Sequence, residues 1–221
     1  MLYKQTLAMV VMAVSVAAPV QWTFESDKPG ELPSGWKTRG GSAKGIYSVV
    51  SEKNGNHFLA ARSHADGVQL GLAIKIRARD YPTLSWRWRV LELPRGADET
   101  RAETMDSAAA VYVAFGSQFF PRILKYVWST SASKGTMIRH PHSRRTVIIV
   151  IDSGDQGIGQ WNVISRSLLD DYRAAFGGDA ATIVAIGVKT DSDSTSSTAA
   201  ADYDDFVFSS PASSQVIGEL R

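Results

Sequence analysis

Short runs in which apolar and polar residues alternate recur along most of the chain. The clearest run spans 83–90, where one side carries Leu84, Trp86, Trp88 and Val90 and the other carries Ser85, Arg87 and Arg89. A period of two residues is the period of a β-strand that buries one face. We therefore expect a strand here, with its tryptophans in the core and its arginines outside.

Other strands are predicted by runs rich in β-branched and aromatic residues. These runs are Ile46–Ser51, Phe58–Arg62, Val68–Ile76, Ala109–Phe115, Ile123–Ser129, Thr146–Ile151, Ile183–Thr190 and Tyr203–Phe208. Asn54-Gly55 lies between the first two runs and predicts a tight hairpin, because this dipeptide suits the two-residue turns of hairpins.

One segment near 166–176 has the spacing of a short helix. Leu168, Leu169, Tyr172 and Phe176 fall near one helical face, and Gly177 follows as a helix-ending residue. Many short strands with one helix, and no regular alternation of strand and helix, predict a mostly β fold. We expect a β-sandwich of jelly-roll type.

The first residues have the layout of a secretory signal. Lys4 precedes the apolar run Leu7–Val16, and Ser15 and Ala17 are small residues at the positions that a signal peptidase reads. The alternative is a buried N-terminal strand. We expect a signal peptide at 1–17, a single domain at 18–208 and a loosely attached tail at 209–221. The predicted location is the periplasm or the cell exterior. The apolar run is too short to span a bilayer, so we expect a mature form that is not membrane-spanning.

Composition narrows the possible chemistry without naming it. Apolar residues make up 44% of the 221 residues, which excludes intrinsic disorder. The 24 Lys+Arg against 22 Asp+Glu give a net charge of +2, too weak a field to indicate nucleic acid. The count of Cys is 0, which excludes disulfides, thiolate zinc sites and cysteine nucleophiles.

The order of motifs resembles the DUF3047 family over roughly residues 22–208. The matching stretches are Leu84–Val90, Gly96–Glu99, Asp106 before Val111–Val113, Tyr126–Ser129, Gly159–Trp161, Arg166, Asp170–Tyr172, Phe176–Gly177 and Thr190–Asp193. This resemblance implies a secreted bacterial protein but no established activity.

A second resemblance concerns architecture. Trp22–Glu25, Leu32–Trp36 and Tyr203–Phe208 look similar to the opening and closing segments of galactose-binding-like jelly-roll modules. That resemblance implies sugar binding and a structural calcium ion between the first and last strands. The candidate ligands are Glu25, Asp27 and Asp205, since calcium takes hard carboxylate oxygens. The alternative is that these side chains are simply solvated.

Arg87 and Arg89 are the leading candidates for ligand binding. Two like charges side by side on one face repel, so they need anionic partners. Those partners are either carboxylates of neighbouring strands or a ligand that carries a carboxylate, phosphate, sulfate or vicinal hydroxyls. Further candidate ligand-binding residues are Asp106, Tyr126, Trp128, Trp161, Arg166, Asp170 and Asp191.

The aromatic candidates each have two interpretations. Trp128 shares a face with Tyr126. The sequence does not decide whether this face is buried in the core or contacts a ligand. Trp161 follows a glycine-rich turn, where an exposed indole would stack on a pyranose ring.

Motifs of known enzymes are missing from the sequence. It has no Gly-x-Ser-x-Gly, no His-Glu-x-x-His and no glycine-rich phosphate loop. The separation of two carboxylates that a glycosidase needs is not visible in a sequence, so the catalytic residues stay unknown. We expect a non-catalytic carbohydrate-binding module whose partner is a glycan or another small anionic or polar ligand. The alternatives are a hydrolase or lyase of an acidic polysaccharide and a structural envelope protein; the oligomeric state is open.

Overall fold

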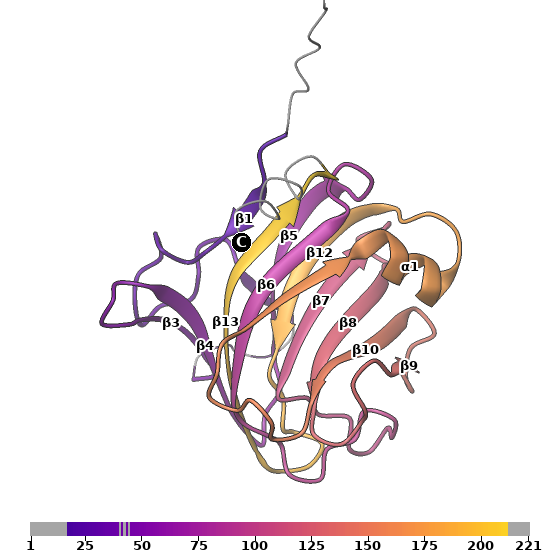
Figure 1. The fold of residues 1–221 in the computed structure, drawn as a ribbon. Helices are drawn as coiled ribbons and strands as arrows, with labels where there is room; N and C mark the ends of the chain where they lie inside the picture. Colours follow the sequence, from indigo (N-terminus) through magenta and orange to yellow (C-terminus); the bar gives the residue numbers. More distant parts are fainter. Residues whose placement is uncertain (1–16, 40, 42, 44, 212–221) are drawn as a thin grey trace, which may run out of the picture.

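Two β-sheets face each other in the computed structural model of the protein (Figure 1). The structure describes residues 17–211 except 40, 42 and 44. The predicted signal peptide, apart from Ala17, and residues 212–221 of the predicted tail therefore lie outside the described residues. No helix in the described part is long and apolar enough to cross a bilayer.

The first sheet, called sheet A, has six strands. Its order is β11 (Asn162–Ser167), β6 (Thr83–Glu92), β13 (Thr198–Ser209), β4 (His57–His64) and β3 (Tyr47–Ser51), and β1 (Val20–Trp22) also pairs with β13. All its pairs are antiparallel. β3 and β4 form the hairpin predicted around Asn54-Gly55, although its connection, residues 52–56, is longer than a two-residue turn.

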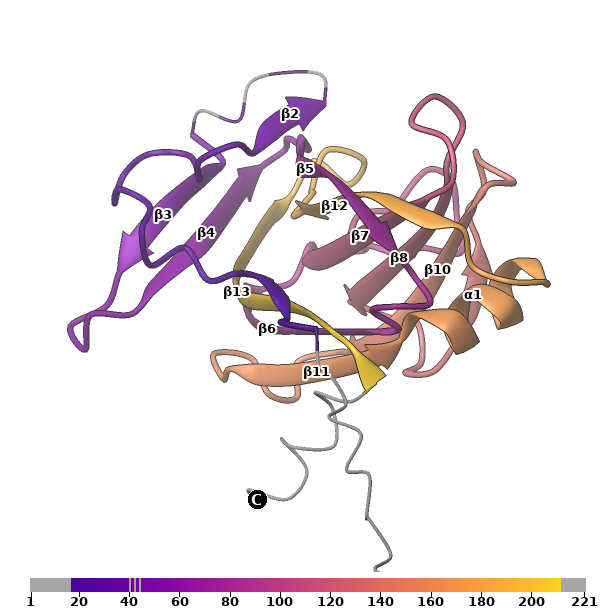
Figure 2. The ribbon, with the colours of Figure 1, turned by 90° about the horizontal axis from the view of Figure 1, so that it is seen from above.

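The second sheet, called sheet B, has seven strands. Its order is β2 (Lys37–Arg39), β5 (Gln69–Arg77), β12 (Thr182–Lys189), β7 (Ala109–Phe115), β8 (Arg122–Ser129), β10 (Thr146–Ser153) and β9 (Met137–Arg139). β8 and β10 run parallel, and the other pairs run antiparallel. Figure 2 shows the two sheets from above, with α1 (Leu168–Phe176) at one side of the sandwich.

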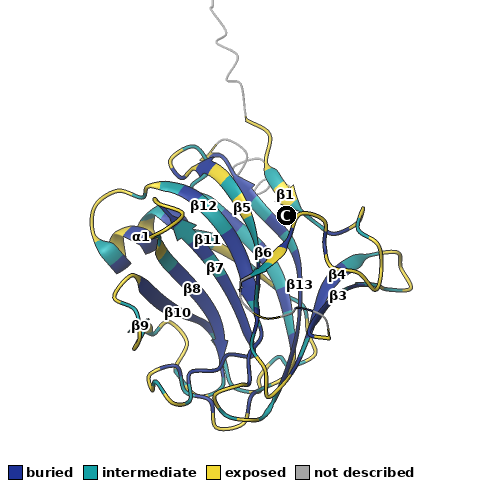
Figure 3. Ribbon diagram, turned by 180° about the vertical axis from the view of Figure 1, so that it is seen from behind, coloured by how far each residue is buried: buried dark blue, intermediate teal, exposed yellow. Residues whose placement is uncertain are grey.

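The core lies between the sheets, where buried positions line both inner faces (Figure 3). Trp86 is 1% exposed and Trp88 is 0% exposed, which confirms the predicted side of β6. Burying a large apolar side chain stabilises the fold by roughly 2–3 kcal/mol. The alternation of β6 is therefore strong enough to fix which face looks inward.

The predicted fold class is confirmed: the protein is mostly β, a sandwich of two sheets with one short helix. Ser167 caps the start of α1 by accepting a hydrogen bond from the Asp170 N–H, and Gly177 ends the helix. The strands that the sequence does not reveal are β1, β2, β9 and β11. Three of these have only three residues, too few for an alternation to show.

Candidate functional site

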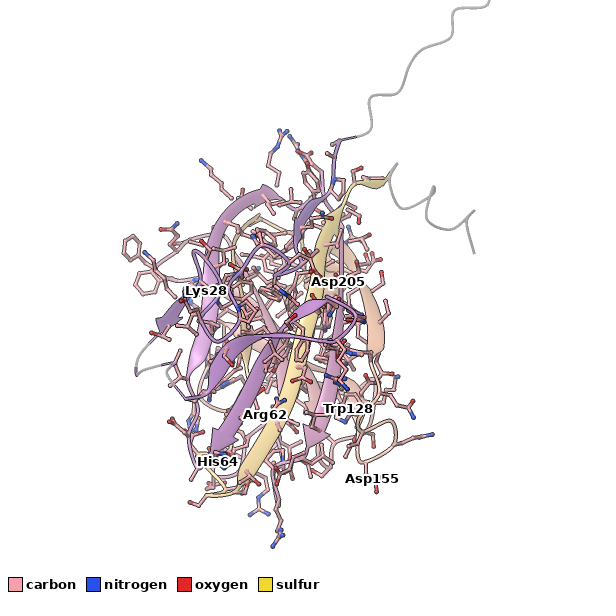
Figure 4. All side chains as sticks on the ribbon, turned by 90° about the vertical axis from the view of Figure 1, so that its left-hand side faces the viewer. Lys28, Arg62, His64, Trp128, Asp155 and Asp205 are labelled. Atoms are coloured by element: carbon pink, nitrogen blue, oxygen red, sulfur yellow. The ribbon has the colours of Figure 1, made fainter. Side chains whose placement is uncertain are left out.

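The predicted arginine pair lies on the outer face of sheet A, opposite the buried tryptophans. Figure 4 looks onto this face and labels Arg62 on β4 and Asp205 on β13. β13 lies between β4 and β6, and its register sets Asp202 opposite Arg89 and Asp204 opposite Arg87. Acidic and basic side chains therefore meet across neighbouring strands.

Two carboxylates of β13 form ion pairs with the arginines on the outer face of sheet A, which we call the arginine face. Asp202 and Asp204 are both fully buried. Arg89 Nη2 lies 2.7 Å from Asp202 Oδ2, and Arg62 Nη1 lies 2.8 Å from Asp202 Oδ1. Arg87 Nη2 lies 2.6 Å from Asp204 Oδ2. The sequence left two kinds of partner for the arginines, carboxylates of neighbouring strands or a ligand. The structure shows carboxylates of a neighbouring strand.

Trp161 covers the two arginines. The Arg87 and Arg89 guanidinium carbons lie 4.7 Å and 4.6 Å from the centre of its indole ring. Phe58 packs edge-on against the same ring at 5.6 Å. Such stacking holds a cation against an aromatic face. Trp161 thus has partners within the protein, and a ligand role for it and the arginines stays a prediction.

Burial also changes the electrostatics of this face. It raises the pKa of Asp204 to about 6, although the hydrogen bond from Arg87 acts in the opposite direction. Asp205 lies 2.8 Å from Arg87 Nε and adds a like charge next to Asp204. The arginines therefore offset the cost of buried negative charge.

The predicted ligand contacts of Tyr126 and Trp128 are corrected by the structure. Tyr126 is 0% exposed and Trp128 is 1% exposed. The Tyr126 hydroxyl donates to Asp171, and the Trp128 indole N–H donates to the Gly154 carbonyl at 2.9 Å. Both side chains follow the inward alternation of β8, so they belong to the core and have no surface to offer a ligand.

Arg166 and Asp170 do not join the arginine face either. Arg166 pairs across the strands with Leu84, on the inward side of β11. Both of its guanidinium arms donate to Asp171, with Nε at 2.9 Å from Oδ2. The Asp170 side chain is 74% exposed in the first turn of α1. The structure therefore does not bring these two candidate residues together with Arg87 and Arg89, and a ligand role for them stays a prediction.

Asp106 and Asp191 come together at one end of sheet B, with Asp193 as a third carboxylate. One oxygen of each lies within 4.8 Å of the others, so this group could hold a metal ion. Asp106 is anchored by the Thr195 N–H at 2.8 Å. Lys189 Nζ lies 2.6 Å from Asp191 Oδ2 and neutralises part of the negative charge.

The predicted calcium ligands Glu25, Asp27 and Asp205 do not form a group of carboxylates with close oxygens. Glu25 accepts the His57 N–H at 3.3 Å, and Asp27 accepts the Ser34 N–H at 2.7 Å. Asp205 pairs with an arginine of β6. In the described part of the chain, the acidic group with close oxygens is the one around Asp106. A metal role for Glu25, Asp27 and Asp205 stays a prediction without support from the geometry.

The outer face of sheet B carries an open groove of about 370 Å³. Its floor consists of small residues on three neighbouring strands: Gly71, Ala73, Ala114, Ala185 and Gly187. A Cβ atom on Gly187 would lie 2.9 Å from the Leu70 carbonyl oxygen, so no larger residue fits without a shift of the backbone. Small side chains at these positions leave the middle of the sheet uncovered.

Tyr112 on β7 is the aromatic residue that lines this groove. One row across the sheet runs through residues that are paired in register: Lys37, Gly71, Gly187, Tyr112 and Lys125. Burial raises the pKa of Tyr112, so its phenol stays neutral. Lys125 Nζ lies 5.7 Å from the centre of the Tyr112 ring. The groove thus contains one aromatic face beside a flat glycine floor.

Lys37 and Gln69 supply polar groups to the groove. Within the described residues, neither side chain has a hydrogen bond or an ion pair. Gln69 Nε2 lies 3.2 Å from the place a Cβ of Gly187 would take, so this amide extends over the floor. Phe119 and Phe120 are 85% and 69% exposed and immediately precede Pro121, which lines the groove. Donors and aromatic surface are therefore both within reach of a ligand.

The sequence analysis does not predict this groove. The pattern that indicates it is the alternation of small residues with inward apolar residues, as at Gly71 and Ala73 and at Ala185 and Gly187. Alternating small residues predict an uncovered strip on one strand. They become a groove only because β5, β12 and β7 are neighbours, and that order is a property of the tertiary fold.

The comparisons with known proteins identify the family of the chain and several solved structures of low similarity. The family model "Protein of unknown function (DUF3047)" matches residues 34–207. None of the curated proteins matches the chain. The family 11 carbohydrate-binding module of a cellulosomal cellulase of Clostridium thermocellum has a TM-score of 0.44 at 12% identity, covering 88% of this chain and 96% of that one.

Two further solved structures are similar at the same level. The CBM22-1 xylan-binding domain of Paenibacillus barcinonensis Xyn10C has a TM-score of 0.40 at 14% identity, covering 88% of this chain and 96% of its own. The K1 adhesin domain of Lys-gingipain from Porphyromonas gingivalis W83 has a TM-score of 0.42 at 13% identity, covering 86% and 97%. Because these similarities are low, they carry no conclusion about the fold or the ligand of this chain.

Proposed function

The chain belongs to the DUF3047 family, and we propose that it is an exported, non-catalytic glycan-binding module whose ligand lies in the groove of sheet B. The observation that carries the proposal is the groove itself, with Tyr112 as an aromatic face and Lys37 and Gln69 as polar groups without partners in the described structure. A sugar ring offers apolar C–H faces to aromatic groups and hydroxyls to polar ones.

The lining of the groove favours binding over hydrolysis. In the part of the chain that the structure describes, that lining includes no Asp, Glu or His. Glycosidases need two carboxyl groups that flank the bond to be cleaved. The proposed ligand is therefore held and released unchanged.

Calcium in the Asp106, Asp191 and Asp193 group is a second part of the proposal. Three carboxylates face one lysine there, which leaves an excess of negative charge and hard oxygen donors. The ion would stabilise the loop ends that carry these residues. Its role is structural, since none of the three lines the groove.

Export to the periplasm or the cell exterior is a third part of the proposal. The motivation is the apolar segment Leu7–Val16 after Lys4. Mass spectrometry of the protein from its native host should give an N-terminus near Ala18. Cytoplasmic protein that retains Met1 would contradict this part of the proposal.

A glycan array followed by calorimetry tests the binding proposal. After the array identifies a glycan, Gln69→Ala should weaken its binding about fivefold, the loss expected for one hydrogen bond of about 1 kcal/mol. Gln21→Ala is the matched control, since Gln21 is an exposed glutamine on β1. An array without any bound glycan, or a Gln69→Ala protein with unchanged affinity, would contradict the proposal.

A further inference from the structure

A separate polar cavity of about 560 Å³ lies where the two sheets end, away from the groove. It is lined by Gly157 and by the polar residues Lys134, Asp152, Ser153, Gln156, Gln160 and Asn162. It shares no lining residue with the groove of sheet B. Figure 4 labels Trp128 and Asp155 at this end of the molecule.

Asp152, one of the residues that line this cavity, has two hydrogen-bond partners within the protein. A shift in the pairing of β10 with β8 between Val150 and Asp152 marks a bulge, a feature that re-aims side chains. Asp152 Oδ2 accepts the indole N–H of the buried Trp88 at 3.1 Å, and Oδ1 accepts Lys134 Nζ at 2.9 Å. Its side chain is 17% exposed and lines the cavity, and each carboxylate oxygen can accept more than one hydrogen bond.

Three amides complete the wall. In the described structure, the side chains of Gln156, Gln160 and Asn162 make no hydrogen bond with the protein. Each amide offers two donors and an acceptor. A carboxylate beside several amides matches a molecule whose neighbouring groups both donate and accept.

The loop that carries these amides is already ordered. The Gly154 N–H donates to the Ser129 carbonyl at 3.0 Å, and the Gly159 N–H donates to the Val90 carbonyl at 2.8 Å. Gly157 has φ +85°, and a Cβ there would lie 3.6 Å from Trp128 and 3.7 Å from Asn162. The loop is therefore tied to both sheets before any ligand arrives, which lowers the entropy cost of binding.

The geometry points to a second binding site in this cavity, for a neutral sugar residue or another polyol with vicinal hydroxyls. Asp152 disfavours an anion, and Lys134 disfavours a metal cation. Vicinal hydroxyls satisfy both kinds of group, since they donate to Asp152 and accept from Lys134 and the amides. This site does not depend on the groove of sheet B or on its ligand.

Nitrogen-15 NMR of the indole N–H groups tests the site directly. The Trp88 indole N–H contacts Asp152, and the Trp128 indole N–H contacts the Gly154 carbonyl in the loop. Titration with D-glucose, D-galactose, D-mannose, D-xylose or sorbitol should shift these two signals. Gln160→Ala combined with Asn162→Ala should weaken that binding about tenfold or more, as the loss of two hydrogen bonds implies.

Controls separate the site from the groove and from other ligands. Gln69→Ala, in the groove, should leave the shifts unchanged, whether or not a glycan binds there. Gln156→Ala is a second variant if the double variant fails to give a folded spectrum. Overturning results are no shift with any of these probes, undiminished shifts in both variants, or a shift with sodium acetate alone, which would show an anion site at Lys134.

Discussion

The outer face of sheet A is covered by its own side chains, whereas the outer face of sheet B is left open. On sheet A, Arg87 and Arg89 meet Asp202 and Asp204, and Trp161 covers them. On sheet B, glycines and alanines leave an open groove around Tyr112. The comparison teaches that a row of charges on a strand indicates a satisfied surface as readily as a ligand site. Small residues at outward positions are the better sign of space for a ligand.

The largest predicted effect is on stability, through the ion pairs on the outer face of sheet A. Asp202→Ala should lower the free energy of unfolding by about 3–5 kcal/mol, because two arginines then lose a fully buried partner. Urea unfolding measures the loss. Asp170→Ala, at an exposed carboxylate, is the control and should change stability by less than about 0.5 kcal/mol. Similar values for the two variants would mean that the ion pairs of sheet A hold little of the fold together.

A cation should stabilise only the acidic group of sheet B. Asp202 has two arginine partners, whereas Asp106, Asp191 and Asp193 face one lysine. Calcium at about 100 times its Kd should add about 2.7 kcal/mol to the free energy of unfolding, since only the native state binds it. Thermal unfolding with calcium and with chelator measures this difference, and Asp106→Asn should abolish it. Identical curves for the wild-type protein would exclude the site.

A smaller, pH-dependent effect is expected beside sheet B. Burial lowers the pKa of His140 from 6.5 to about 4, and the positive charge of Lys125 acts in the same direction. The unfolded chain then binds more protons than the folded chain between these values, so stability falls as the pH drops from 6.5 towards 4. The loss should be about 1 kcal/mol by pH 5, because solvent screens a half-buried ring.

Urea unfolding at a series of pH values measures this slope. His140→Asn should flatten it, whereas His142→Asn, at an exposed histidine nearby, should leave it in place. An unchanged slope in the His140→Asn protein would show that this histidine is not the group responsible.

Local patterns predict much of the fold. The strands from Thr83, Ala109 and Thr146 and the helix from Leu168 are all visible in the sequence, because their alternation or helical spacing is strong. The side of each face also follows, as Trp86 and Arg87 show. The pairing order of the strands does not follow, because it depends on contacts between segments far apart in the chain.

The candidate site was predictable only in part. Arg87 and Arg89 are visible as an outward pair, but their partners come from β13, more than 100 residues later in the chain. Tyr126 and Trp128 show that alternation alone separates the two faces of a strand without telling which aromatics meet solvent. The role of Gly187 in the groove floor could not be predicted from the sequence, because it depends on which strands are neighbours in the sheet.

The most direct test of the account compares a blocked groove with an uncovered arginine face. Ala114→Trp places a large side chain on the groove floor, and Trp161→Ala removes the indole that lies over Arg87 and Arg89. Calorimetry with the glycan identified on the array should show binding lost in Ala114→Trp and retained within about threefold in Trp161→Ala, since only the first variant alters the groove. Retained binding in Ala114→Trp together with lost binding in Trp161→Ala would move the site to sheet A and contradict the account.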